Sequence, residues 1–121
     1  YWVAQSARRQ LVEFYIEQRQ LGEASDIIAQ LTSDNARNTY LQVLMAQAQQ
    51  QPAAFTRLAQ RAFEQAQMAG DVSLSLDLAL LLLTESQQLS NGDFYSSFIA
   101  DNAPKYWLRR NEKELIALNI N

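Results

Sequence analysis

Apolar residues recur along most of this chain at steps of three and four positions, which is the period of one face of an α-helix. Residues 2–19 form the first such stretch, with Val3, Ala7, Leu11, Phe14 and Tyr15 on one face. After a break at Leu21-Gly22, the next stretch places Ala24, Ile27, Ile28 and Leu31 together. The pattern predicts two helices that form an antiparallel hairpin over about residues 2–32.

A second hairpin is predicted over about residues 34–70. Its first helix spans about residues 36–50, and Thr32-Ser33-Asp34 supplies side chains suited to capping its start. Pro52 fits the first turn of the next helix. That helix has the cleanest amphipathic stripe of the chain: Phe55, Leu58, Ala59, Ala62, Phe63 and Ala66. Gly70 suits the left-handed residue that follows a helix.

A third hairpin is predicted over about residues 71–101, with Asp71 as the cap of its first helix. This helix, about residues 72–87, has almost no polar face, because leucine or alanine occupies 74, 76 and 78–83. A helix that is apolar all round must be covered on several sides. A tight connection at Asn91-Gly92-Asp93 leads into a short helix with four apolar positions: Phe94, Tyr95, Phe98 and Ile99.

The last stretch, residues 104–118, predicts one or two helices that close or continue the array. Pro104 suits a helix start, and Asn111 and Glu114 have the spacing of a capping box. Only three Gly and two Pro occur in 121 residues, so the whole pattern predicts an all-α protein. We expect residues 1–121 to be a single domain or a fragment of a longer repeat protein.

Composition and charge exclude several classes of function. The chain has no Cys and no His, which removes thiolate sites, disulfides and the commonest general base. A net charge of −3 argues against nucleic acid as the main partner. The longest apolar run, Leu78–Leu83, is too short to span a membrane. We therefore expect a soluble protein, either cytoplasmic or periplasmic, without a choice between the two.

A degenerate repeat runs through the predicted hairpins, since Ala24, Ala59 and Gly92 follow one another at steps of 35 and 33 residues. The pattern resembles the tetratricopeptide-repeat family, whose unit is a helix hairpin of about 34 residues. The matching positions are Leu11, Tyr15, Leu21–Ala24, Ile28 and Leu31 in the first unit, Ala59, Phe63 and Ala66 in the second, and Ala79, Leu83, Gly92, Ile99 and Pro104 in the third. Gln47, Gln50 and Ser96 depart from the family pattern.

The resemblance implies a right-handed α-solenoid in which stacked hairpins form a concave groove lined by the first helix of each pair. Carried over by register, the residues that face this groove are Arg9, Glu13, Ile16, Leu41, Leu44, Leu74, Asp77, Leu81 and Glu85, together with Ser6 and Ala48. The centre of this surface is apolar and its rim is charged. It suits a peptide or an amphipathic helix of a partner protein.

Other ways of covering the same apolar surface remain open. The C-terminal residues Tyr106, Trp107, Leu108, Leu115 and Ile116 can occupy the groove or cap the last hairpin, and a second copy can dimerise through it. A functional alternative is a structural helical segment of a larger protein whose flanking parts cover the apolar faces. The basic cluster 105–110 with Lys113 suits either phosphate contacts with base stacking on Trp107 or, as we expect, a terminal helix with inward aromatic residues.

Catalysis finds little support in the sequence. Glu13 and Glu17 share a helix face, but nothing in the pattern indicates the burial that raises a carboxyl pKa for acid or base work. There is no phosphate-binding glycine loop, no nucleophile elbow and no metal-ligand spacing. We expect a non-catalytic scaffold, of bacterial origin, that binds a protein or peptide and needs no cofactor and no metal.

Overall fold

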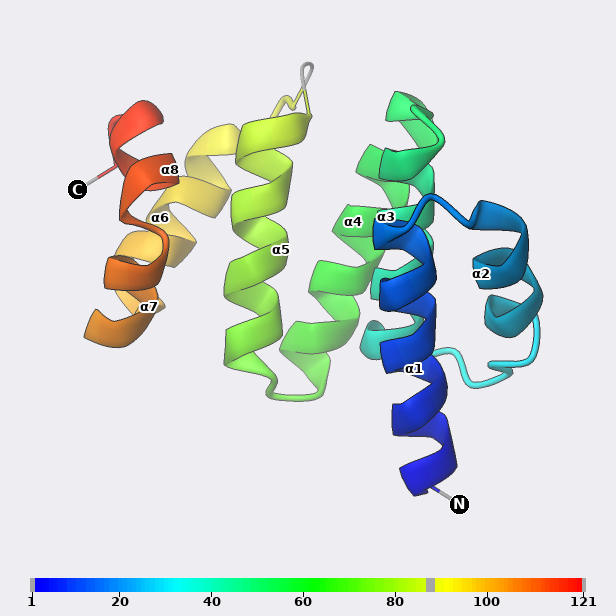
Figure 1. Ribbon diagram of the computed structural model, residues 1–121. Helices are drawn as coiled ribbons and strands as arrows, with labels where there is room; N and C mark the ends of the chain where they lie inside the picture. The colour runs from blue at the N-terminus through cyan, green and yellow to red at the C-terminus, as the bar shows by residue number, and fades with distance from the viewer. Residues whose placement is uncertain (1, 87–88, 121) are drawn as a thin grey trace.

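In the computed structural model, which describes residues 2–86 and 89–120, all regular secondary structure is helical (Figure 1). The predicted all-α class is therefore confirmed. The described residues form these helices: α1 (Trp2–Glu17), α2 (Leu21–Ile28), α3 (Ala36–Ala48), α4 (Pro52–Met68), α5 (Val72–Glu85), α6 (Gly92–Asn102), α7 (Lys105–Arg110) and α8 (Glu112–Ala117).

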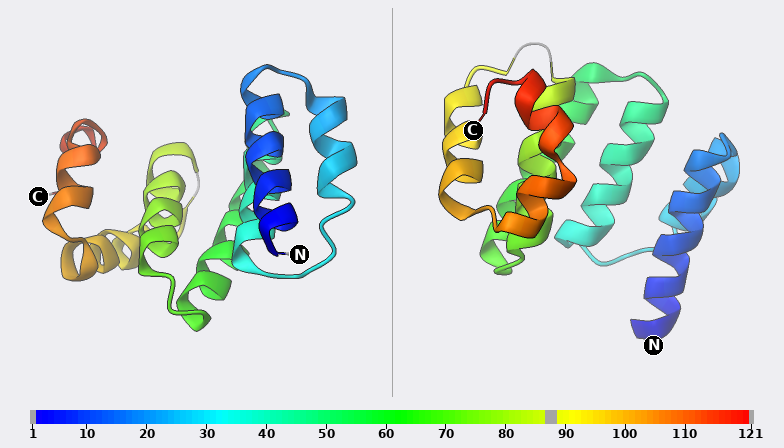
Figure 2. Two further views of the ribbon diagram at one scale, coloured as in Figure 1. Left: turned by 60° about the horizontal axis from the view of Figure 1, so that its bottom comes forward. Right: turned by 60° about the vertical axis from the view of Figure 1, so that its left-hand side comes forward.

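The helices are arranged as a row of neighbouring antiparallel pairs, with the two termini at opposite ends of the row (Figure 1). Helices α1 and α2, α3 and α4, and α5 and α6 pack against each other, and α1 and α4 also contact α3 and α5, respectively. Helices α7 and α8 follow one another beside α5 and α6 (Figure 2). Thus α1, α3, α5 and the α7–α8 segment alternate with α2, α4 and α6 along the chain.

Two apolar clusters hold the row together. The larger cluster contains residues of every helix from α3 through α8. Its most deeply buried large side chains are Leu76, Leu78, Leu82, Ile99 and Trp107. The smaller cluster joins α1, α2 and α3 through Val12, Ala24, Leu41 and Met45. Because α5 has buried side chains over most of its circumference, the expectation that this helix is covered on several sides is confirmed.

Four helices end in the same way, with a residue at positive φ just beyond the helix. These residues are Arg19, Gln50, Gly70 and Asn119, and the next backbone N–H donates to the carbonyl five residues earlier, at 2.8–2.9 Å. This 6→1 bond is the signature of the Schellman motif. Gly70 was predicted in this role, and its φ of 72° confirms it. The motif ends α1 and α3 two residues before the predicted ends at 19 and 50.

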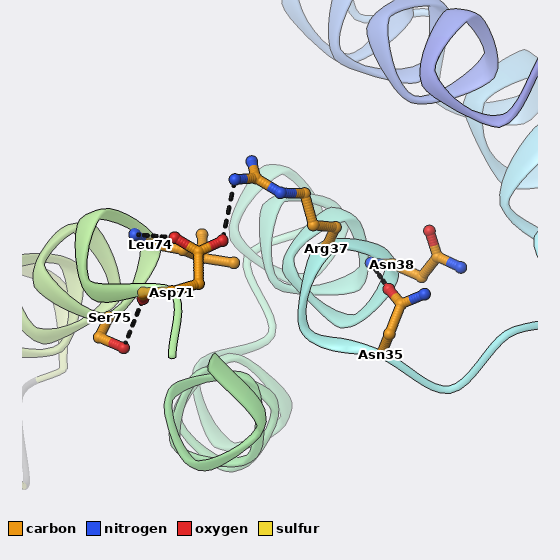
Figure 3. Close-up of polar contacts among 6 residues, drawn as sticks. All are labelled: Asn35, Arg37, Asn38, Asp71, Leu74 and Ser75. Carbon is orange, nitrogen blue, oxygen red and sulfur yellow. Dashed lines mark hydrogen bonds and ion pairs between the residues drawn. The ribbon is translucent and has the colours of Figure 1, made fainter. Parts of the chain in front are cut away.

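Two predicted caps are wrong and one is confirmed. The start of α3 is capped by Asn35, whose side chain accepts from the Asn38 N–H at 2.9 Å, and not by Thr32-Ser33-Asp34. Asn111 occupies the N-cap position of α8, but its side chain makes no cap hydrogen bond and its Nδ2 donates to the Trp107 carbonyl at 2.9 Å, so no capping box forms with Glu114. Asp71 caps α5 as predicted, accepting from the Leu74 N–H at 3.1 Å (Figure 3).

Asp71 also links two helix pairs, because its other carboxylate oxygen lies 2.9 Å from a terminal nitrogen of Arg37 on α3 (Figure 3). We expect Asp71→Ala to lower the free energy of unfolding by about 1 kcal/mol, mainly through loss of the cap. Asp71→Asn keeps a capping oxygen and loses only the ion pair, so its cost should stay below about 0.5 kcal/mol. Urea denaturation followed by circular dichroism measures both, with Arg37→Ala as the matched control. Equal costs for the two Asp71 variants would contradict the capping role.

Candidate binding groove

Two adjoining hollows lie along the helices that come first in each pair. One has a volume of about 320 Å³ and is lined by α3, α5 and the α7–α8 segment through Tyr40, Leu44, Asp77, Leu80, Leu81, Thr84, Glu85, Asn111 and Glu114. The other, about 290 Å³, lies between α1 and α3 and is lined by Ile16, Glu17, Arg19, Leu44, Gln47, Ala48 and Gln50. Leu44 lines both hollows, and the two together are here called the groove.

Six of the predicted groove residues line the groove: Ile16, Leu44, Ala48, Asp77, Leu81 and Glu85. Leu41 and Leu74 do not, since they are only 1% and 4% exposed. This is a correction to their prediction as surface residues. Leu41 packs in the smaller cluster against α1 and α2, and Leu74 packs in the larger one.

Arg9 and Glu13 lie near the groove without lining it. The Nε of Arg9 donates to the side-chain oxygen of buried Asn38 at 3.0 Å, so Arg9 joins α1 to α3. Glu13 is half-buried, and this burial, followed by the nearby charge of Glu17, raises its pKa, while Arg37 acts in the opposite direction. Arg9 therefore holds α1 against α3, and the charge of Glu13 raises the pKa of Tyr40, which lines the first hollow.

Several lining residues were not predicted. Tyr40 and Leu80 both line the first hollow. Tyr40 lies one turn before Leu44, so the spacing could have identified it. Gln47 and Gln50, which depart from the repeat pattern, line the second hollow. Asn111 and Glu114 had no signal in the sequence, because their place depends on how the C-terminal segment packs.

The C-terminal segment packs beside the groove and forms one of its walls. The side chain of Trp107 is fully buried, and its Nε1 donates to an Asp77 carboxylate oxygen at 2.8 Å. Arg110 approaches the same oxygen at 3.6 Å. Leu115 is also buried, whereas Tyr106 and Ile116 are exposed. A fully buried Trp107 cannot stack on a base, which contradicts the nucleic-acid alternative for this cluster.

The floor of the groove has a negative electrostatic environment. Burial raises the pKa of the Tyr40 hydroxyl, and the charges of Glu13 on one side and Asp77 on the other raise it further. The neutral hydroxyl is therefore favoured, and it remains a hydrogen-bond donor or acceptor near neutral pH. The groove thus combines leucine side chains, one phenol and a set of carboxylates.

The described residues bring together no group of three or more acidic side chains that could hold a metal ion. Among the same residues, no helix is both long and apolar enough to cross a membrane. The chemistry that the groove offers is non-covalent binding through apolar contact, hydrogen bonds and charge. Searches against protein-family models, curated proteins and solved structures found no match to this chain.

Proposed function

We propose that this chain is a tetratricopeptide-like right-handed α-solenoid that acts as a non-catalytic scaffold and holds a peptide or amphipathic helix of a partner protein in the groove. The observation that supports this most is the position of Leu44 and Leu81. Both are half-buried, Leu44 lines both hollows, and Leu81 lies across from it on α5. Apolar side chains that line a groove between parallel helix walls suit the apolar stripe of a helix.

The alternation of helices supports the same proposal. The groove is lined by α1, α3, α5 and the α7–α8 segment, while α2, α4 and α6 contribute none of its residues. In stacked helix hairpins, the first helix of each pair lines the inner surface and the second lies outside. The C-terminal segment then takes the place of the first helix of a further unit.

The test uses a synthetic amphipathic peptide with leucines at positions i, i+3, i+4 and i+7 and glutamine on its polar face. We expect the chain to bind it and the double variant Leu44→Glu with Leu81→Glu to bind at least about tenfold more weakly, since two buried apolar contacts become charged. Fluorescence anisotropy of the labelled peptide measures the affinity.

Met68→Glu is the matched control, because Met68 is 90% exposed at the end of α4 and lies outside both hollows. It adds one negative charge, half of what the double variant adds, without touching the groove, so the peptide should bind it as it binds the parent chain. Circular dichroism checks that helicity is retained in each variant. Unchanged binding by the double variant, or no binding by the parent chain, would refute the proposal.

A second candidate function, a structural segment of a larger helical protein, is favoured by a different observation. Apolar side chains are exposed at both ends of the row: Leu11 and Phe14 on α1 are 41% and 51% exposed, and Tyr106 and Ile116 on α7 and α8 are 61% and 63% exposed. Further helices stacked on either end would cover them. This function needs no ligand in the groove, so the peptide experiment separates the two candidates.

A further inference from the structure

The charges around the groove are unevenly distributed. Among the described residues that line it, Glu17, Asp77, Glu85 and Glu114 are acidic and Arg19 is basic. The carboxylates come from three different helices: Glu17 from α1, Asp77 and Glu85 from α5, and Glu114 from α8. Acidic groups therefore border the apolar floor on several sides.

Most of these carboxylates form no ion pair with an arginine in the described part of the chain. Within residues 2–86 and 89–120, the ion pairs of Arg37, Arg61 and Arg110 go to Asp71, Asp34 and Asp77. The Nη1 of Arg19 donates a long hydrogen bond of 3.5 Å to the Ala48 carbonyl. In that part of the chain, Glu17, Glu85 and Glu114 are exposed and form no ion pair.

The negative potential reaches the floor as well as the rim. Tyr40 is close enough to Glu13 on α1 and to Asp77 on α5 for both to oppose ionisation of its hydroxyl, in addition to burial. A cation in the first hollow would lie among Asp77, Glu85 and Glu114, with the leucine side chains beneath it. An anion there would be repelled from every one of these groups.

We propose that the occupant of the groove is a basic amphipathic helix, with apolar anchors over Leu44, Leu80 and Leu81 and with lysine or arginine side chains that reach Glu85 and Glu114. This inference rests on the proposed function and adds the charge of the partner. Lysine and arginine suit the site because their aliphatic stems can lie on leucine while their charged ends reach a rim carboxylate. Complementary charge gives such a complex its orientation and its preference over acidic partners.

Three synthetic peptides test the proposal. They share one leucine stripe and differ in the polar face, which holds lysine, glutamine or glutamate. We expect the lysine peptide to bind the chain about tenfold more tightly than the glutamine peptide at low salt, and the glutamate peptide to bind most weakly. The advantage of the lysine peptide should shrink as ionic strength rises, because exposed charges are screened. Fluorescence anisotropy titrations at two salt concentrations measure all three.

Paired variants locate the effect within the molecule. The double variant Glu85→Gln with Glu114→Gln should bind the lysine peptide about three- to tenfold more weakly than the parent chain does. Its affinity for the glutamine peptide should be unchanged. Glu23→Gln with Glu64→Gln removes the same net charge from exposed positions on α2 and α4 that line neither hollow. This control variant should bind the lysine and glutamine peptides with the affinity of the parent chain. Equal weakening by the two double variants would overturn the inference, since it would show attraction to the acidic chain as a whole.

The remaining outcomes separate this inference from the proposed function. If all three peptides bind equally, the groove binds helices but the charge inference is wrong. If none binds, the proposed function fails and the inference falls with it. Sedimentation of the chain alone tests a second copy as the occupant. A dimer that Leu44→Glu with Leu81→Glu dissociates would overturn the choice of a basic helix.

Discussion

Trp107→Ala is expected to lower the free energy of unfolding by about 3 to 5 kcal/mol, which is the usual cost of removing a large aromatic side chain from a core. Trp107 is the largest fully buried side chain of the described residues, and it packs in the larger apolar cluster. The substitution removes the one buried side chain of α7, which leaves partly buried Leu108 as the remaining contact of this helix with the larger cluster. It also removes the hydrogen bond from Nε1 to Asp77. Thermal and urea denaturation followed by circular dichroism measure the loss.

The damage should be local, because each pair in a row of helices contacts mainly its neighbours. We expect amide hydrogen exchange of Trp107→Ala to be faster over residues 105–118, while the amides of α3 keep the protection of the parent chain. The α7–α8 segment also contributes Asn111 and Glu114 to the groove. Peptide affinity should therefore fall with the same substitution, although Trp107 itself does not line the groove.

Trp107→Phe separates packing from the hydrogen bond. Phenylalanine retains most of the buried apolar surface and lacks the indole donor. Because the side chain of Asp77 is 41% exposed, water can satisfy its carboxylate, and the cost of the lost bond should be about 1 kcal/mol. A Trp107→Ala protein as stable as the parent, or a Trp107→Phe protein as unstable as Trp107→Ala, would contradict the packing role of this residue.

The helices were predictable because their apolar spacing records which face is buried. Long stripes such as that of α4 specify a helix from many residues at once. The ends were less predictable, since they depend on one residue each. Gly70 marks an end because glycine adopts positive φ without strain, but Arg19 and Gln50 adopt φ values of 60° and 56° where nothing in their residue type indicates it.

Groove residues were harder to predict than helices, because the choice between core and surface changes within one turn. Leu41 and Leu44 are three positions apart on α3, yet the first is buried against α1 and α2 and the second lines the groove. Which leucine is covered depends on the angle at which the neighbouring helices cross, and spacing along one helix does not contain that angle. The contribution of Asn111 and Glu114 depends in the same way on the docking of Trp107.

Phe63→Ala is expected to destabilise the middle of the row as strongly as Trp107→Ala destabilises its end. Phe63 on α4 is 3% exposed and meets three aromatic rings of α6 edge to face. Its ring centroid lies 5.1 Å from Tyr95, 5.1 Å from Phe98 and 6.0 Å from Phe94. Burial of the ring accounts for about 3 to 5 kcal/mol, and this figure already includes part of the edge-to-face contribution of about 0.5 to 1.5 kcal/mol per pair.

Two variants bracket this effect. Phe63→Leu retains much of the volume and should cost about 1 to 2 kcal/mol, while Phe94→Ala removes a ring that is 54% exposed and should cost less than about 1 kcal/mol.

Helix α4 packs against both α3 and α5, so Phe63→Ala should lower the midpoint of the whole urea transition and not only that of the C-terminal segment. Neither α4 nor α6 lines the groove. The folded fraction of Phe63→Ala should therefore bind the glutamine peptide with parental affinity, and a loss of affinity in the folded fraction would show that the groove depends on the outer helices.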